Sequence, residues 1–309
     1  RRIVQDSDSD RRAPFARCRP TKTHVPMTHQ TPAVYPINLD HVPEIKLIAC
    51  DMDGTLLDDD QAIHEDFWPL IDQLHARGIV FCPASGRQYY NLVECFKPIA
   101  DKVIFIAENG TYVVRGGVEL SADCLARDIA RELIRVTRDL HSSGADVGAV
   151  LCGKRSAYIE RMDPVFFAEV VPYYHRLDRV GNLLAVEDDI LKVAVFDFAS
   201  SERISAPAFA RYRDTHQVAI SGPHWLDIMA PQANKGSGLR HIQETLRITR
   251  DQTMVFGDFL NDLEMMDEAT YSFAMANAHP LLKQRARFLS PGNTDNGVVR
   301  TIKSVLGFE

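Results

Sequence analysis

Several features that define large protein classes are missing from this sequence. None of its apolar runs approaches the ~20 residues that a membrane-spanning helix needs. Its 309 residues carry a formal net charge of -7, so no overall positive field attracts nucleic acid. The six cysteines include no close pair typical of zinc sites, and the 11 histidines show no metal-ligand spacing. We therefore expect no membrane partner, no nucleic-acid partner and no zinc site.

The residues that are present describe an ordinary globular protein. The hydrophobic fraction is 45% and the charged fraction is 25%. At roughly 100–200 residues per domain, the length suggests two domains. Cys50 and Cys82 lie in apolar segments and are expected to be buried free thiols. Such thiols favour a reducing compartment, so we expect a cytoplasmic location.

The N-terminal residues have a different character from the rest. Residues 1–26 mix arginine, aspartate, serine and proline without periodicity, and they lack the apolar core of a secretory signal. Met27 is a candidate start of the natural chain. We expect residues 1–43 to form a disordered or loosely packed extension with no catalytic role.

From Glu44 onward, short apolar segments alternate with amphipathic ones. Residues 46–50, 79–82 and 103–107 are predicted strands, and the first is followed by a helix with apolar residues at i, i+3, i+4 and i+7. The same alternation returns at residues 235–306. This pattern predicts an α/β fold with a Rossmann-like parallel sheet, covered by helices on both faces.

The middle of the chain breaks this alternation. A hairpin signal at residues 111–120 is followed by strands and helices in mixed order. We therefore expect an α+β cap at residues 113–221, inserted between two halves of the core at residues 44–112 and 222–309.

Four polar clusters follow predicted strands, at the edge where open α/β sheets bind ligands. The first contains Asp51 and Asp53, with Gly54 and Thr55 directly after them. Two carboxylates so close together raise each other's pKa unless a cation lies between them, and Mg²⁺ prefers such oxygen ligands. Gly54 allows a sharp turn that leaves backbone N–H groups for phosphate oxygens. We interpret this cluster as a metal and phosphate site rather than as a capped loop.

The second and third clusters are candidate anion sites. Ser85 and Gly86 offer a hydroxyl and a backbone N–H at a helix N-terminus, although serine is also a common N-cap. Lys235 begins a predicted helix, where the helix dipole disfavours a cation. A nearby anion such as Asp51 or a phosphate would explain this lysine, and a solvated surface position is the alternative.

The fourth cluster adds oxygen ligands. Asp258, Asn261 and Asp262 follow a buried strand. Asp258 is a candidate for the further hard ligand that Mg²⁺ needs, whereas Asn261 and Asp262 are equally suited to cap the next helix.

The order of these motifs resembles the haloacid dehalogenase superfamily, and they span residues 51–262. The insert is similar to the α/β cap of the Cof-type, class IIB phosphatases. Residues 85–90 and 156–158 further resemble the bacterial sugar-phosphate phosphatases of that group.

The resemblance implies a role for each candidate residue. Asp51 would attack phosphorus to form an aspartyl-phosphate, and Asp53 would act as acid and then base. Mg²⁺ would be bound by Asp51, the backbone carbonyl of Asp53 and Asp258, with Asp262 orienting Lys235 or a metal-bound water. The expected phosphate-binding residues are Thr55, Ser85, Gly86, Lys235 and Asn261.

Two alternatives to a phosphatase remain open on the sequence. A phosphomutase of the same superfamily would use the same Asp51 and Asp53. A regulator that binds sugar phosphates without catalysis is the alternative from a different class. The expected partner is a small phosphorylated metabolite, for which sugar phosphates, flavin mononucleotide and pyridoxal phosphate are candidates. The oligomeric state stays open.

Overall fold

A computed structural model of the protein describes residues 42–308. The expected N-terminal extension therefore lies outside the described residues, apart from residues 42 and 43. Within the described part of the chain, no helix is both long and apolar enough to cross a lipid bilayer.

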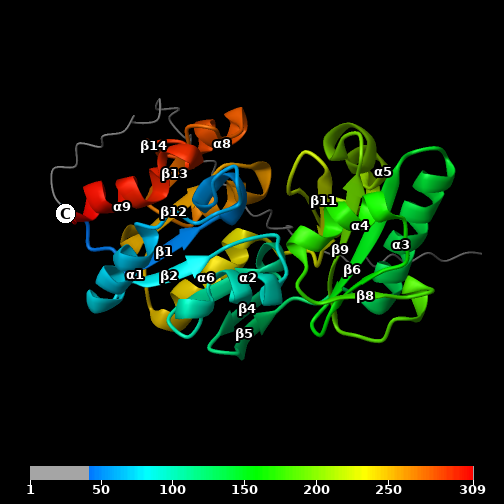
Figure 1. The fold of residues 1–309 in the computed structure, drawn as a ribbon, viewed down its shortest axis with the longest axis horizontal. Coiled ribbons are helices and arrows are strands. Elements are labelled where there is room, and N and C mark those ends of the chain that lie inside the picture. The colour runs from blue at the N-terminus through cyan, green and yellow to red at the C-terminus, as the bar shows by residue number, and fades with distance from the viewer. Residues whose placement is uncertain (1–41, 309) are drawn as a thin grey trace, which may run out of the picture. The chain divides into compact units, whose positions relative to one another are not determined.

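A five-stranded parallel sheet forms the centre of the core (Figure 1). Its spatial order is β14-β13-β12-β1-β2. The four residues of β1 are all buried, as expected for a strand covered on both faces. The strands are β1 (Leu47–Cys50), β2 (Val80–Pro83), β12 (Thr253–Gly257), β13 (Tyr271–Met275) and β14 (Phe288–Ser290).

Helices bury the faces of this sheet. The predicted apolar stripe of α1 is entirely buried; it consists of Phe67, Leu70, Ile71 and Leu74. These residues join one hydrophobic cluster that also contains residues of β1, β12 and α9. The core helices are α1 (Phe67–Ala76), α2 (Tyr89–Cys95), α6 (Lys235–Leu246), α7 (Leu263–Asp267), α8 (Pro280–Arg285) and α9 (Gly297–Leu306).

A short antiparallel sheet extends the core beyond β2. It consists of β3 (Ile104–Ala107), β4 (Tyr112–Arg115) and β5 (Val118–Ala122). A parallel bridge between Ala84 and Ile106 connects β3 to the end of β2. We expected the cap to begin at residue 113, but β4 and β5 pair with β3 instead of with the cap sheet.

The cap is built on a six-stranded sheet (Figure 1). Its order is β10-β11-β9-β6-β7-β8, and only β7 and β8 pair in parallel. Alternate residues of β6 enter two separate hydrophobic clusters, one with α3 and one with α4, so helices cover both faces. The elements are α3 (Arg127–Ser142), β6 (Val147–Gly153), β7 (Ala157–Ile159), α4 (Pro164–Val170), β8 (Leu177–Arg179), β9 (Ile190–Asp197), α5 (Ala206–Ala208), β10 (Gln217–Ile220) and β11 (Trp225–Met229).

At the other end, β11 pairs with β9, so the cap sheet extends to residue 229. That residues 113–221 form a cap domain separate from the core stays a prediction. The expected Rossmann-like core with an inserted α+β cap is confirmed.

Candidate active site

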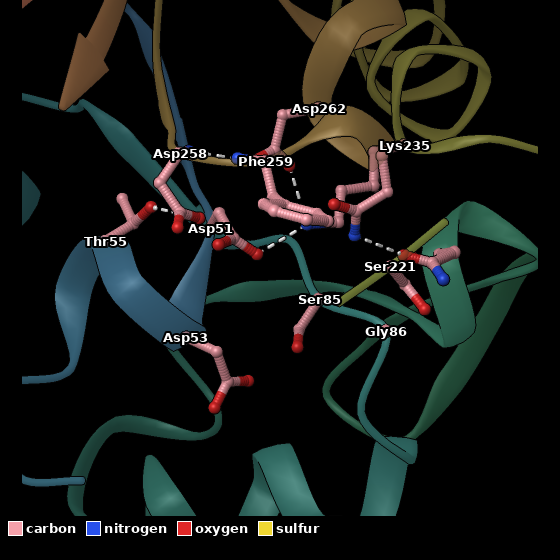
Figure 2. Close-up of polar contacts among 12 residues, drawn as sticks. Asp51, Asp53, Thr55, Ser85, Gly86, Ser221, Lys235, Asp258, Phe259 and Asp262 are labelled. Atoms are coloured by element: carbon pink, nitrogen blue, oxygen red, sulfur yellow. Dashed lines mark hydrogen bonds and ion pairs between the residues drawn. The ribbon is translucent and has the colours of Figure 1, made fainter. Parts of the chain in front are cut away.

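Three carboxylates meet at the carboxyl edge of the parallel sheet (Figure 2). Asp51 follows β1, and Asp258 follows the neighbouring parallel strand β12. Asp262 ends the short helical turn after β12. One ligand atom from each of the three lies within 4.8 Å of the others. Asp51 and Asp258 are therefore close enough to share one coordination sphere.

The charge balance of this carboxylate cluster fits a divalent cation. Burial, with the charge of Asp262, raises the pKa of Asp51 to about 7 from an ordinary value of 3.8. Burial, with the charges of Asp51 and Asp262, raises the pKa of Asp258 to about 9. The carboxylates therefore need more positive charge than the surrounding side chains supply. A hard cation with oxygen ligands, such as Mg²⁺, would provide it.

Lys235 is the cation that the chain itself supplies to the cluster (Figure 2). Its Nζ donates hydrogen bonds to Asp51 Oδ1 and, at 2.7 Å, to Asp262 Oδ1. Burial alone would lower the pKa of Lys235, but Asp262 and Asp51 together raise that pKa above its ordinary value. The side chain is fully buried, so the alternative of a solvated surface lysine is excluded. The carboxylates explain why a cation begins α6 against the helix dipole.

Asp262 is engaged on both carboxylate oxygens. Its Oδ1 accepts from Lys235, and its Oδ2 accepts from the backbone N–H groups of Asp258 at 3.0 Å and Phe259 at 3.3 Å. These bonds hold the loop after β12 in place. They favour Asp262 as the residue that orients Lys235, rather than as a direct metal ligand.

The turn after β1 is packed tightly against Asp258. Gly54 has a φ of +74°, and a Cβ at this position would lie 2.3 Å from Asp258 Oδ2. The Thr55 hydroxyl donates to Asp258 Oδ1 at 3.3 Å. Thr55 thus contacts a candidate metal ligand, and its expected role in phosphate binding stays a prediction.

Asp53 lies apart from the carboxylate cluster (Figure 2). Its two oxygens accept hydrogen bonds from Arg87, at 2.8 Å from Nε and 2.5 Å from Nη2. Arg87 directly follows Ser85 and Gly86 of the second cluster, but the sequence analysis predicted no role for it.

Ser85, Gly86 and Asn261, three of the expected phosphate-binding residues, line one cavity together with Asp51 and Asp53. This cavity has a volume of 310 Å³. Ser85 Oγ accepts a hydrogen bond from the backbone N–H of Arg87 at 3.1 Å. Asn261 donates to Asn109 Oδ1 at 2.9 Å. The cavity-lining residues of the core are Asp51, Asp53, Gly54, Ser85, Gly86, Arg87, Asp258, Phe259 and Asn261.

The cap closes the other side of this cavity with aromatic side chains. The ring centroids of Tyr173 and Trp225 are 5.4 Å apart, and His224 lies beside Phe196 at 5.6 Å. All four residues line the cavity. The cap therefore contributes aromatic side chains to this cavity, together with the charged residues Glu169, Lys192 and Asp227.

A buried ionic network also connects the cap to the core. Lys192 of β9 lies 3.0 Å from Glu108 Oε2 and 3.3 Å from Asp227 Oδ1, and donates to the backbone oxygen of Gly86 at 2.6 Å. Asn109 donates to Asp227 as well. Glu108 and Asn109 have φ values of 51° and 58°, which non-glycine residues rarely adopt. This strained turn brings core side chains against cap strands β9 and β11.

Sequence comparison identifies the family of the chain. A sequence model of the haloacid dehalogenase-like hydrolases matches residues 48–302. The chain belongs to this family. The resemblance in the motifs is thus confirmed, and the hydrolase is a phosphatase of the haloacid dehalogenase superfamily.

Individual relatives of this hydrolase agree in function class and in fold. An Escherichia coli protein named "5-amino-6-(5-phospho-D-ribitylamino)uracil phosphatase YbjI" is 36% identical over 275 residues, covering 86% of this chain and 97% of the relative. The structure of SMU.1108c from Streptococcus mutans is similar with a TM-score of 0.79 and 26% identity, over 85% of this chain and 99% of that one. The fold also matches a structure described as the subclass IIB sugar phosphatase BT4131, with a TM-score of 0.74 at 18% identity, over 85% of this chain and all of that one.

Several residues of the hydrolase cavity were missed by the sequence analysis. Tyr173, His224 and Trp225 belong to cap segments without a recognisable motif. Two other cap residues, Tyr158 and Arg176, line a separate cavity of 680 Å³. Tryptophan is rare in this chain, with two residues, but its rarity alone does not point to Trp225.

Proposed function

We propose that this phosphatase is Mg²⁺-dependent and hydrolyses small phosphorylated sugars or sugar alcohols through an aspartyl-phosphate on Asp51. The observation that carries the proposal is the cluster of Asp51, Asp258 and Asp262 around one buried lysine at the sheet edge. Carboxylates with raised pKa values and a single cationic side chain are suited to bind a divalent ion and the phosphate that accompanies it.

The proposed reaction has two steps. In the first, an Asp51 oxygen forms a bond to phosphorus while the bond to the substrate oxygen breaks, and Asp53 gives its proton to that oxygen. In the second, water attacks the phosphorus, gives a proton to Asp53 and releases inorganic phosphate and free Asp51. Lys235 holds Asp51 by an ion pair and adds positive charge where the phosphoryl group would develop negative charge.

Mg²⁺ would be held by Asp51, Asp258 and the backbone carbonyl of Asp53, and would supply further positive charge to the phosphoryl oxygens. Asp262 would orient Lys235, to which it is hydrogen-bonded. Ser85, Gly86 and Asn261 line the cavity beside Asp51 and are the proposed phosphate contacts.

The cap supports a substrate with an aromatic ring at the end remote from the phosphate. Tyr173, His224 and Trp225 form a wall that offers aromatic contacts. The name of the Escherichia coli relative describes a substrate with a uracil ring, a ribityl chain and a terminal phosphate. We include this class of ring-bearing sugar-alcohol phosphate among the proposed substrates.

A phosphate-release screen tests the proposal. The protein is assayed on ring-bearing and simple sugar phosphates, with added Mg²⁺ and with excess chelator. We expect steady release of inorganic phosphate that requires the metal. Equal rates in chelator would contradict the metal dependence, and transfer of phosphate between positions without net release would indicate a mutase.

A further inference from the structure

Arg87 uses every N–H group of its guanidinium in hydrogen bonds. Nε and Nη2 donate to the two carboxylate oxygens of Asp53 at 2.8 and 2.5 Å. Nη2 also donates to Gln61 Oε1. Nη1 donates to Asn91 Oδ1 at 3.1 Å and makes a longer contact of 3.4 Å to the backbone oxygen of Pro172. A guanidinium has five N–H donors, so this set saturates it.

These partners restrain the Arg87 side chain, which in turn restrains Asp53. The Arg87 side chain is 6% exposed, whereas that of Asp53 is 36% exposed and lines the cavity. The backbone N–H of Arg87 is tied to Ser85 Oγ, and its guanidinium lies 5.2 Å from the centre of the Tyr173 ring in the cap. Arg87 is thus held from the core and from the cap, and Asp53 is the partner that lines the cavity.

The two-point bond also fixes the direction of the Asp53 carboxylate. A bidentate arginine–carboxylate pair restricts rotation of the carboxylate plane, which a single hydrogen bond does not. Proton transfer requires that the acid reach its target oxygen within hydrogen-bond distance, so orientation of this group affects the rate directly.

We propose that Arg87 is a positioning residue that orients Asp53 for proton transfer to the leaving oxygen and from the attacking water. The inference rests on the proposed role of Asp53 as acid and base. Arg87 itself exchanges no proton and forms no bond to phosphorus in either step. Its contribution therefore depends on whether the leaving group needs a proton.

Two substrates separate this role from a structural one. The oxygen of an alkyl phosphate, such as a sugar-alcohol phosphate, leaves only when it is protonated, whereas the nitrophenolate of p-nitrophenyl phosphate leaves without a proton. We compare kcat/KM, which reports only the steps up to formation of the aspartyl-phosphate, because the later attack of water is common to both substrates. We expect Asp53→Asn to lower kcat/KM much more on the alkyl phosphate than on the aryl phosphate. Arg87→Ala should show the same pattern, with a loss of about a hundredfold on the alkyl phosphate.

A double variant makes the test sharper. If Arg87 acts only through Asp53, Arg87→Ala should cause no further loss of kcat/KM on the alkyl phosphate in the Asp53→Asn background. Arg87→Lys keeps the charge but loses the two-point bond, so it should show a smaller loss with the same dependence on the leaving group. Arg87→Lys also tests the proposal if the Arg87→Ala variant does not fold.

The matched control is Arg138 in the cap, which makes an equivalent two-point pair with Glu160 at 2.8 and 2.6 Å. Arg138→Ala should leave the ratio of the two kcat/KM values unchanged. Equal losses of kcat/KM on both substrates in the Arg87 variants, or a further loss in the double variant, would overturn the positioning role. Wild-type protein that released phosphate from neither substrate would overturn the proposed function instead.

Discussion

At the scale of single residues, the carboxylate cluster defines how stability depends on pH. Asp51 and Asp258 have pKa values of about 7 and about 9 in the folded protein, against an ordinary value of 3.8. A carboxyl group whose pKa is raised by folding binds its proton more tightly in the native state. Its stabilising contribution is complete below the unfolded pKa and is lost as pH rises through the folded pKa.

The first prediction follows from this sign. Without metal, the free energy of unfolding should fall as pH rises from about 5 to about 9, and Asp258→Asn should flatten that fall. Because Mg²⁺ binds the deprotonated carboxylates, added Mg²⁺ should stabilise the protein most at the high end of the range. Urea unfolding in chelator and in Mg²⁺ measures both effects. A free energy of unfolding that rises with pH in chelator would contradict the charge balance that we describe. The same pH dependence in the wild type and in Asp258→Asn would contradict it as well.

At the scale of elements, local patterns predicted the strands and helices but not all of their partners. The α1 stripe and the helix that begins at Lys235 follow directly from apolar periodicity. The β4–β5 hairpin was recognised as a hairpin, yet its pairing with β3 depends on contacts that a local signal does not encode. The same limit hid the pair between Arg87 and Asp53, which are 34 residues apart in the chain.

The second prediction concerns the turn that joins β1 to the rest of the core. Gly54→Ala places a Cβ 2.3 Å from Asp258 Oδ2, so Asp258 must move. We expect kcat to fall by about a hundredfold, because small displacements of catalytic groups are costly. The concentration of Mg²⁺ that gives half-maximal activity should rise at the same time. Steady-state phosphate release across a Mg²⁺ titration measures both quantities.

Gly78→Ala is the matched control for this turn. Gly78 has a φ of +71°, close to the +74° of Gly54, but its Cβ would meet nothing within 4 Å. The control should lose about 1 kcal/mol of stability from the left-handed backbone and keep its kcat. If both variants lose activity equally, the contact between Gly54 and Asp258 is not the cause.

At the scale of the whole molecule, buried charges bind the cap to the core. Lys192 on cap strand β9 and Glu108 in the core are both nearly inaccessible to solvent, with exposures of 2% and 1%. Sequence analysis gave no signal for this pair, since Lys192 directly precedes an apolar strand segment and Glu108 ends another. Only the packing of cap on core brings them together.

The third prediction tests this connection. Lys192→Met leaves the buried carboxylates of Glu108 and Asp227 without their cation, so it should cost about 3–5 kcal/mol of stability. Lys154→Met removes a more exposed lysine paired with Glu119 and should cost less than about 1 kcal/mol. Urea unfolding of both variants gives the comparison. Equal losses of stability in the two variants would contradict a stabilising role of the buried network between cap and core.

The central claim is that Asp51 is the nucleophile of a phosphatase, and the rate of phosphate release by Asp51→Asn tests it most directly. The substitution keeps the size of the side chain, and folding of the variant is checked by circular dichroism. We expect kcat to fall by at least about a thousandfold on every phosphate ester that the wild-type protein hydrolyses, because removing a nucleophile abolishes the covalent pathway. A folded Asp51→Asn variant that releases phosphate at a rate close to that of the wild type would contradict the account.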